Sequence, residues 1–275
     1  SGSSSSSSLS SLSSSASSVT ARNATENIAF KSVGASVTTQ AASVAVTFVG
    51  AGDIANSENN DEATARLLDQ IVTENPNVTV FTLGDNAYPD GKASNFTDYY
   101  APTWGRHKSR TKPSAGNHDW SVPNASDYLN YFCISSSDCN FPGGTQRYYY
   151  SYNLGNWHIV VLDSELDVSI NSAQASWLTQ DLKDNPRACT LAYWHKPRFG
   201  SSNGSGDNNN MKPLWDILYA AGADIILNGH DHHYERFDPQ DPSGVKDFTK
   251  GIREFIVGSG GAGLYNFNST PSANS

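Results

Sequence analysis

The chain of 275 residues has little charge and no long apolar segment. Asp, Glu, Lys and Arg make up 16% of the residues, and an excess of acids gives a net charge of −9. This charge disfavours a nucleic-acid scaffold, because most of the surface would repel a phosphate backbone. No apolar run reaches the ~20 residues that a membrane-spanning helix needs. We therefore expect no transmembrane segment, and no signal-peptide pattern is visible in the printed sequence.

The first 42 residues differ in composition from the remainder. Fourteen of residues 1–20 are serines, and such a segment buries too little apolar surface to fold. We expect residues 1–42 to be a Ser/Thr-rich disordered leader or linker. The remaining residues, 43–275, are expected to form one domain, because the chain is 37% hydrophobic and long enough for one sizeable core.

The three cysteines bear on the compartment of the protein. Cys133 and Cys139 lie in a Ser-rich segment at a spacing compatible with a local disulfide, whereas Cys189 lies in an apolar segment and is expected to be a buried free thiol. With the leader, a disulfide indicates a secreted, periplasmic or cell-surface protein. Three reduced cysteines in a cytosolic protein are the alternative, because spacing alone does not prove a bridge.

Strand-like and helix-like segments alternate after the leader. Runs of β-branched and apolar residues predict strands at 44–50, 78–83, 113–117, 147–153, 157–162, 190–194, 223–227 and 254–257. Helical periodicity predicts helices at 62–73, 173–183 and 211–221. The alternation is typical of α/β folds, whose catalytic crevice lies at the carboxyl ends of the strands. The turn at 154–156 indicates antiparallel neighbours, so a mixed sheet or a two-sheet sandwich with outer helices fits better than a purely parallel sheet.

Polar side chains that could bind metal ions follow five of these strands. They are Asp53, Asp85, Asn117 with His118, His195, and His230 with His232. Carboxylate, amide and imidazole groups are ligands of divalent and trivalent ions. Six or seven such groups exceed the four or so that one zinc ion takes. Two ions that share a carboxylate account for the number better, and such pairs, ~3.5–4 Å apart, serve phosphoryl transfer.

Five sequence blocks contain these polar residues and span about 180 residues: Gly52-Asp53, Gly84-Asp85-Asn86-Ala87-Tyr88, Gly116-Asn117-His118-Asp119, Ala192-Tyr193-Trp194-His195 and Gly229-His230-Asp231-His232. In these blocks and their order, the chain resembles the calcineurin-like metallophosphoesterases and, within them, the purple acid phosphatases. The resemblance, closest to the small single-domain type, implies that residues 43–275 form the catalytic domain. It also implies a four-layer α/β/β/α sandwich of two mixed β-sheets flanked by helices, with the metal site at the strand ends.

Two positions indicate the purple acid phosphatases within this superfamily. Many relatives carry a His where this chain has Ala55, and the purple acid phosphatases carry a Tyr at the position of Tyr88. A tyrosinate ligand favours a hard trivalent ion, so the resemblance implies Fe(III) in the first site, whose ligands would be Asp53, Asp85, Tyr88 and His232. The second site would hold Fe(II), Zn or Mn on Asp85, Asn117, His195 and His230. A packing role for Tyr88 is the alternative.

The resemblance implies a phosphoric monoester hydrolase of the acid-phosphatase type, with a metal-bound hydroxide as nucleophile. A small phosphorylated substrate is compatible with the negative net charge, because bound cations reverse the local field. His118 is the candidate for protonating the leaving alkoxide, because it adjoins the ligand Asn117 without being a ligand. His233 and Arg198 are candidates for holding the phosphate, the latter in a bidentate manner.

Other functions fit the same residues. A phosphodiesterase or a nucleotide or phospholipid hydrolase could use the same metal site. A non-catalytic surface binding protein is a further alternative, although intact ligand positions argue against it. Residues 200–210 contain no His where plant-type members carry a substrate-contacting His pair, so substrate contacts are not expected to follow the family in this loop.

Overall fold

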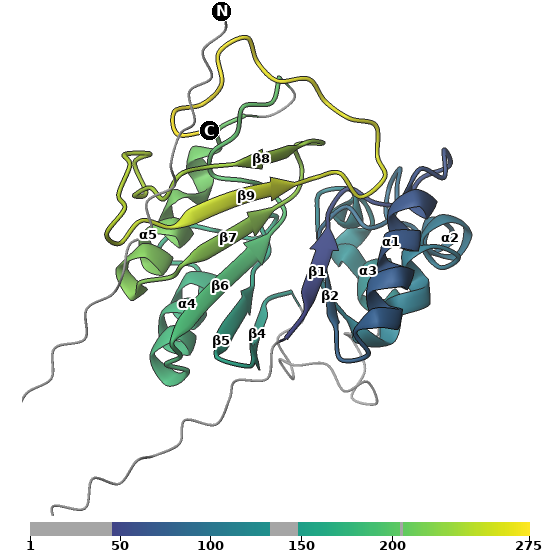
Figure 1. Ribbon diagram of the computed structural model, residues 1–275, viewed down its shortest axis with the longest axis horizontal. Helices are drawn as coiled ribbons and strands as arrows, with labels where there is room; N and C mark the ends of the chain where they lie inside the picture. Colours follow the sequence, from purple (N-terminus) through teal and green to yellow (C-terminus); the bar gives the residue numbers. More distant parts are fainter. Residues whose placement is uncertain (1–45, 133–147, 204–205) are drawn as a thin grey trace, which may run out of the picture. The chain divides into compact units, whose positions relative to one another are not determined.

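The computed structural model describes residues 46–132, 148–203 and 206–275. The chain divides into two units, residues 1–41 and 42–275, and every described residue belongs to the second. This second unit contains two β-sheets with helices on their outer faces (Figure 1). Within the described ranges, no helix has the length and apolarity to cross a membrane. The predicted disulfide partners Cys133 and Cys139 lie outside those ranges, and the division at residue 42 stays a prediction.

The smaller sheet has three parallel strands in the order β1-β2-β3. Its strands are β1 (Phe48–Ala51), β2 (Thr79–Leu83) and β3 (Thr111–Ser114). Its helical segments are α1 (Asp61–Glu74), α2 (Ala93–Asn95), η1 (Phe96–Tyr100), η2 (Trp104–Arg110), η3 (Asp119–Ser121), η4 (Pro123–Ala125) and α3 (Ser126–Tyr131). Side chains such as Leu68 of α1 and the ring of Tyr100 form one apolar cluster on its outer face.

The larger sheet has six strands in the order β4-β5-β6-β7-β9-β8. The strands are β4 (Tyr150–Leu154), β5 (Trp157–Val161), β6 (Cys189–Trp194), β7 (Ile225–Asn228), β8 (Tyr234–Arg236) and β9 (Arg253–Val257). The four central strands are parallel, and the edge strands β4 and β8 are antiparallel to their neighbours. Its helical segments are α4 (Ala173–Asp184), η5 (Asn209–Met211) and α5 (Lys212–Ala221).

The outer helices of the larger sheet begin and end at residues that favour these boundaries. The Ser172 hydroxyl accepts a hydrogen bond from the Ala175 N–H and so caps the first turn of α4. Pro213 lies in the first turn of α5, and Gly222 ends this helix in the left-handed conformation, with a φ of 79°. Both helices bury their apolar faces against the sheet, in one core cluster that includes Leu178 and Leu214.

A third apolar cluster packs the two sheets face to face. It joins Phe81 and Leu83 of β2 to side chains from β4, β5, β6 and β7 of the larger sheet. Two tyrosines of the larger sheet also donate hydrogen bonds to the edge strand of the smaller one. The Tyr150 hydroxyl binds the Pro113 carbonyl at 2.8 Å, and the Tyr193 hydroxyl binds the Lys112 carbonyl at 2.8 Å. These bonds satisfy buried polar groups and connect the two layers.

The predicted two-sheet sandwich with outer helices is confirmed, and several details differ. The described part of the smaller sheet is wholly parallel rather than mixed. Strand β3 ends at Ser114, because its pairing with β2 stops there, and not at residue 117. Strand β8 was not predicted, since only one of its three side chains is buried. Cys189 is a free thiol as predicted, but it is half-buried because it begins β6 at the rim of the sheet.

The packing of α5 against the larger sheet predicts a large effect of truncating Leu214, whose side chain is fully buried. We expect Leu214→Ala to lower the free energy of unfolding by about 2–5 kcal/mol, because it removes buried apolar surface and leaves a cavity. Urea denaturation measures this change. The matched control is Leu67→Ala on α1, whose side chain is 60% exposed, and which should change stability by less than about 0.5 kcal/mol. Equal effects of the two substitutions would contradict this account of the core.

Candidate metal centre

The carboxyl ends of five parallel strands deliver the polar side chains to one place. Asp53 follows β1, Asp85 follows β2, Asn117 follows β3, His195 follows β6, and His230 and His232 follow β7. Asp53, Asp85 and His230 have φ angles of 60°, 50° and 69°. This left-handed region is uncommon for residues with a side chain, and strained backbones of this kind gather at functional sites.

Two glycines allow these loops to come as close as they do. A Cβ atom on Gly116 would lie 2.2 Å from Oδ1 of Asp85, and a Cβ atom on Gly229 would lie 2.7 Å from Oδ2 of Asp53. Both distances are far below van der Waals contact. The glycines in the sequence blocks are therefore required by the approach of one loop to the carboxylate of another.

One group of donor atoms surrounds the Tyr88 hydroxyl. Its oxygen lies 3.0 Å from Oδ1 of Asp53, 3.1 Å from Oδ2 of Asp85 and 3.0 Å from Nε2 of His232. The Nδ1–H of His232 donates to the Gly263 carbonyl at 2.7 Å, because a carbonyl oxygen can only accept, and this fixes Nε2 as the atom that faces the group. A single O–H can be donated to only one of the two carboxylate oxygens at a time, whereas a cation can be bound by all of these donor atoms together.

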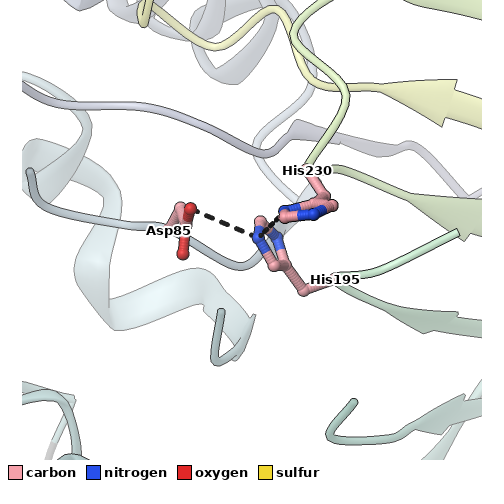
Figure 2. A group of neighbouring side chains, drawn as sticks. All are labelled: Asp85, His195 and His230. Atoms are coloured by element: carbon pink, nitrogen blue, oxygen red, sulfur yellow. Dashed lines mark hydrogen bonds and ion pairs between the residues drawn. The ribbon is translucent and has the colours of Figure 1, made fainter. Parts of the chain in front are cut away.

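A second group of donor atoms surrounds Nε2 of His195. This nitrogen lies 3.2 Å from Oδ2 of Asp85, 3.1 Å from Oδ1 of Asn117 and 3.2 Å from Nδ1 of His230. The Nδ1–H of His195 donates to the Leu83 carbonyl at 2.7 Å. Figure 2 shows Asp85, His195 and His230, whose ligand atoms all lie within 4.8 Å of one another. Oδ2 of Asp85 belongs to both groups.

Burial and charge act against each other at this centre. Burial opposes ionisation of Asp85, but its interactions with His195 and His118 together outweigh it and hold the pKa of Asp85 below its usual value. Burial likewise opposes protonation of His195, yet the Asp85 carboxylate raises the pKa of this imidazole to about 10. Burial and the charge of His195 together lower the pKa of His230 to about 3. The buried carboxylates thus require a positive charge between them, which a proton or a metal ion can supply.

The same carboxylates shift the pKa values of Tyr88 and His232. Burial, followed by the charges of Asp53 and Asp85, raises the pKa of the Tyr88 phenol far above its usual value. For His232, burial opposes protonation, but the interactions with Asp53, the Gly263 carbonyl and Asp85 together outweigh it and raise the pKa of the imidazole. A tyrosinate at this position would therefore need a strongly bound cation beside it.

The donor atoms are of the types that bind metal ions, and hydrogen bonds to backbone carbonyls orient the imidazoles among them. Carboxylate, phenol, amide and imidazole groups converge from both sheets, and Asp53, Asp85 and His195 are buried with at most 1% of each residue exposed. Metal-binding imidazoles usually donate their second N–H to a backbone carbonyl or a carboxylate. His195 and His232 both do so, to Leu83 and to Gly263. The donor arrangement therefore fits a metal centre.

His118 lies beside the centre with part of its ring in solvent. Its backbone N–H donates to Oδ1 of Asp85 at 2.8 Å, and its Nδ1–H donates to the Pro89 carbonyl. The other ring nitrogen, Nε2, lies 3.8 Å from Oδ2 of Asp85, and the side chain is 37% exposed. The ring packs against Tyr88 with 4.5 Å between ring centroids. His118 is therefore next to the donor atoms and accessible from outside.

The two predicted phosphate contacts are not brought into the cluster. His233 is 5% exposed, its Nε2 lies 3.0 Å from Oε2 of Glu235, and the ring of Phe267 covers it at 4.4 Å. Arg198 is 6% exposed; its guanidinium donates to the Pro242 carbonyl, and its backbone N–H donates to Glu254. Both side chains are committed to packing within the larger sheet and its loops. Their chemical type suggested a phosphate contact, whereas their burial could not be read from the sequence.

Several supporting residues were missed by the sequence analysis. The buried Asp119 carboxylate accepts hydrogen bonds from the Gly116 N–H and from the side chain and backbone of Asn86, which holds two ligand loops together. Burial, followed by the charge of Asp85, raises its pKa to about 7. Asp119 stands in the third sequence block, which was a usable signal. Gly263 and Tyr265, which contact His232, had none, because 31 residues or more separate them from it.

Comparison with known proteins gives the family. The calcineurin-like phosphoesterase model matches residues 46–234. The chain belongs to this family. It is 29% identical over 161 residues to probable purple acid phosphatase 20 of Arabidopsis thaliana, a match that covers 52% of this chain and 38% of that protein. Acid phosphatase type 7 of Danio rerio is 28% identical over 153 residues, or 45% of this chain and 33% of that protein. This member of the family thus spans less than half the length of these relatives.

Two solved structures share the fold of this family member. Purple acid phosphatase PPD1 from yellow lupin seeds superposes with a TM-score of 0.63 and 20% identity, over 81% of this chain and 45% of that one. GAP50 of Plasmodium superposes with a TM-score of 0.57 and 16% identity, over 82% of this chain and 77% of that one. At these identities the likeness concerns the fold alone, and it agrees with the two-sheet sandwich described above.

Proposed function

We propose that this phosphoesterase is a phosphoric monoester hydrolase of the acid-phosphatase type that works with two metal ions. The observation that carries the proposal is the position of Asp85. Its Oδ2 atom belongs both to the group around the Tyr88 hydroxyl and to the group around Nε2 of His195. A carboxylate oxygen common to two sets of donors is what a pair of ions that share one ligand requires.

The proposed ligand sets follow these two groups. Asp53, Asp85, Tyr88 and His232 would hold the first ion, and Asp85, Asn117, His195 and His230 the second. The phenol in the first set favours Fe(III), and the nitrogen-rich second set suits Fe(II), Zn or Mn. When bound, such a pair lowers the pKa of coordinated water and neutralises phosphate charge. Support for the monoester reaction comes from the relatives named purple acid phosphatase and acid phosphatase.

The residues of the chain have distinct tasks in the proposed reaction. Asp53 and Asp85 hold their carboxylates at the centre, in the strained loops after β1 and β2. The Leu83 and Gly263 carbonyls fix the rings of His195 and His232. His118 would give a proton from Nε2 to the leaving alkoxide, because this nitrogen faces the centre while Nδ1 is held by Pro89. A small phosphorylated substrate would reach the centre from the exposed side of His118.

The domain boundary and the compartment also belong to the proposal. Residues 43–275 would form the catalytic domain, and the Ser-rich residues 1–42 would act as a linker or surface tether. A secreted, periplasmic or cell-surface location is supported by the composition of this leader. A Cys133–Cys139 disulfide would agree with that location.

Removal of the shared carboxylate tests the metal-dependent reaction. We expect Asp85→Ala to lower the content of both metals and to reduce kcat/KM on p-nitrophenyl phosphate by more than about 100-fold, the upper range for residues that only support ligands. Elemental analysis and rate measurements check this. Asp216→Ala, at a partly exposed ion pair with Lys212 on α5, is the matched control and should retain both properties. Full metal content and full rate in Asp85→Ala would refute the proposal. If the native chain cleaves bis(p-nitrophenyl) phosphate faster than p-nitrophenyl phosphate, the site would be assigned to diesters.

The assignment of Fe(III) predicts a colour that depends on one residue. Since burial and the two carboxylates hold the pKa of the Tyr88 phenol high, only a strongly bound cation such as Fe(III) would convert it to tyrosinate. The iron-loaded protein should show a visible charge-transfer band that disappears in Tyr88→Phe and persists in the control Tyr219→Phe. Visible absorption spectra decide the matter. A colourless protein with both ions bound and full activity would rule out the iron assignment.

The proposed role of His118 predicts a dependence on the leaving group. With a poorly leaving alkoxide, as in n-butyl phosphate, His118→Ala should lower kcat by about 10²–10⁴-fold, the usual contribution of a general acid. With p-nitrophenyl phosphate the loss should be much smaller, because the phenolate leaves without a proton. Steady-state rates on both esters measure the difference. Equal losses on the two esters would mean that His118 does not act as the acid.

A further inference from the structure

The segment that follows β9 contacts His232 in three ways. The Gly263 carbonyl accepts a hydrogen bond from Nδ1 of His232 at 2.7 Å, and the Tyr265 backbone N–H donates to the His232 carbonyl at 2.9 Å. The Tyr265 ring stacks on the His232 imidazole, with 4.0 Å between centroids and 11° between planes. Ring plane, tautomer and backbone position of His232 are therefore all set by residues 263–265, which we call the C-terminal clasp.

The clasp is anchored at both of its ends. On one side, the Gly260 N–H donates to the Gly52 carbonyl and the Ala262 N–H donates to the Asp53 carbonyl, each at 2.9 Å. On the other side, the Asn268 N–H donates to the Ser201 carbonyl at 2.7 Å, and its side chain donates to the Ser202 carbonyl. In Figure 1 the segment continues from β9 toward the end of β1 before it turns back. The position of Tyr265 is thus determined by its surroundings, although its own side chain is 40% exposed.

The clasp and the preceding residue, Ala262, join two proposed ligands that the two sheets contribute separately. Asp53 follows β1 of the smaller sheet, whereas His232 follows β7 of the larger one. Both are bound by the same short segment, through Ala262 to Asp53 and through residues 263–265 to His232. Asp53 and His232 belong to the group around the Tyr88 hydroxyl. His195, in the other group, is fixed instead by the Leu83 carbonyl of β2.

We infer that the C-terminal clasp positions His232 for the first metal ion, and that Tyr265 is a positioning residue of that site. This inference rests on the proposed two-metal function. The ring of Tyr265 restrains the His232 imidazole by stacking, so that Nε2 faces Oδ1 of Asp53 at 3.3 Å and the Tyr88 hydroxyl at 3.0 Å. Retention of the first ion should then depend on the Tyr265 ring, and retention of the second should not.

The test compares metal retention in the full chain and its Tyr265 variants. Tyr265→Ala should weaken retention of Fe(III) in the first site by about 10–100-fold, the range for residues that orient metal ligands, while Zn in the second site stays bound. Tyr265→Phe should behave as the native chain, because stacking needs the ring and not the hydroxyl. Competition with a chelator, followed by the tyrosinate band and by elemental analysis, measures both ions.

Matched variants separate positioning from a general effect on the segment. Leu264→Ala removes a neighbouring side chain that is 73% exposed and should change neither ion. Phe267→Ala removes the ring that packs on His233, which is not a proposed ligand, and should also leave the first ion in place. His232→Ala and His195→Ala define the patterns for loss of the first and of the second site. Urea denaturation of each variant confirms that the fold is retained.

The outcomes distinguish this inference from the proposed function. Unchanged Fe(III) retention in Tyr265→Ala, equal loss of both ions, or equal effects of Tyr265→Ala and Phe267→Ala would overturn the inference while leaving a two-metal enzyme intact. Competition with Zn(II) as the only ion repeats the comparison without iron, so a wrong iron assignment does not affect it. Absence of monoester hydrolysis in the native chain would refute the proposed function, and the retention data would still decide the role of Tyr265.

Discussion

Two buried carboxylates at one point constrain the rest of this structure. Asp53 and Asp85 are at most 1% exposed, and both carboxylates contact the Tyr88 hydroxyl. Carboxylates out of contact with water repel each other and lose solvation, so a positive charge must lie between them. The pKa of His195 is raised for this reason, because a protonated imidazole supplies positive charge beside the carboxylates. A pair of bound metal ions would also supply this positive charge, and it would in addition lower the pKa of coordinated water.

The fold supplies this arrangement at a conformational cost. Parallel strands end at one edge of a sheet, and two sheets packed face to face bring two such edges together. Tight loops after the strands then bring the polar side chains together, and Asp53, Asp85 and His230 in these loops have left-handed backbone conformations. Such strain costs on the order of 1–3 kcal/mol per residue, and it persists because hydrogen bonds from neighbouring loops fix the backbone. Asp119, which binds the Asn86 and Gly116 backbones, is one of these restraints.

The sequence reveals the parts of the site that lie within short blocks. Each block joins a strand pattern to a glycine and a polar side chain, and both signals are local, so the strand ends and their convergence could be predicted. The burial of Arg198 and His233 could not, because it depends on Glu254 and Phe267, which lie far from them along the chain. Strand β8 has too short a pattern to recognise. The contacts of Tyr265 with His232 arise only from tertiary folding, and no spacing rule indicates them.

The tyrosines between the sheets have a mechanical consequence. The hydroxyls of Tyr150 and Tyr193 on the larger sheet bind successive carbonyls, those of Pro113 and Lys112, on strand β3 of the smaller one. Two hydrogen bonds to adjacent residues of β3 resist sliding of one sheet over the other. Asp53, Asp85 and Asn117 follow strands of the smaller sheet, whereas the three proposed histidine ligands follow strands of the larger one. A displacement of one sheet by about 1 Å would therefore misplace the two sets of proposed ligands relative to each other. A misplacement of this size can lower a reaction rate by about 10²-fold. The two phenol–carbonyl bonds between the sheets would thereby keep the proposed ligands of the two layers aligned.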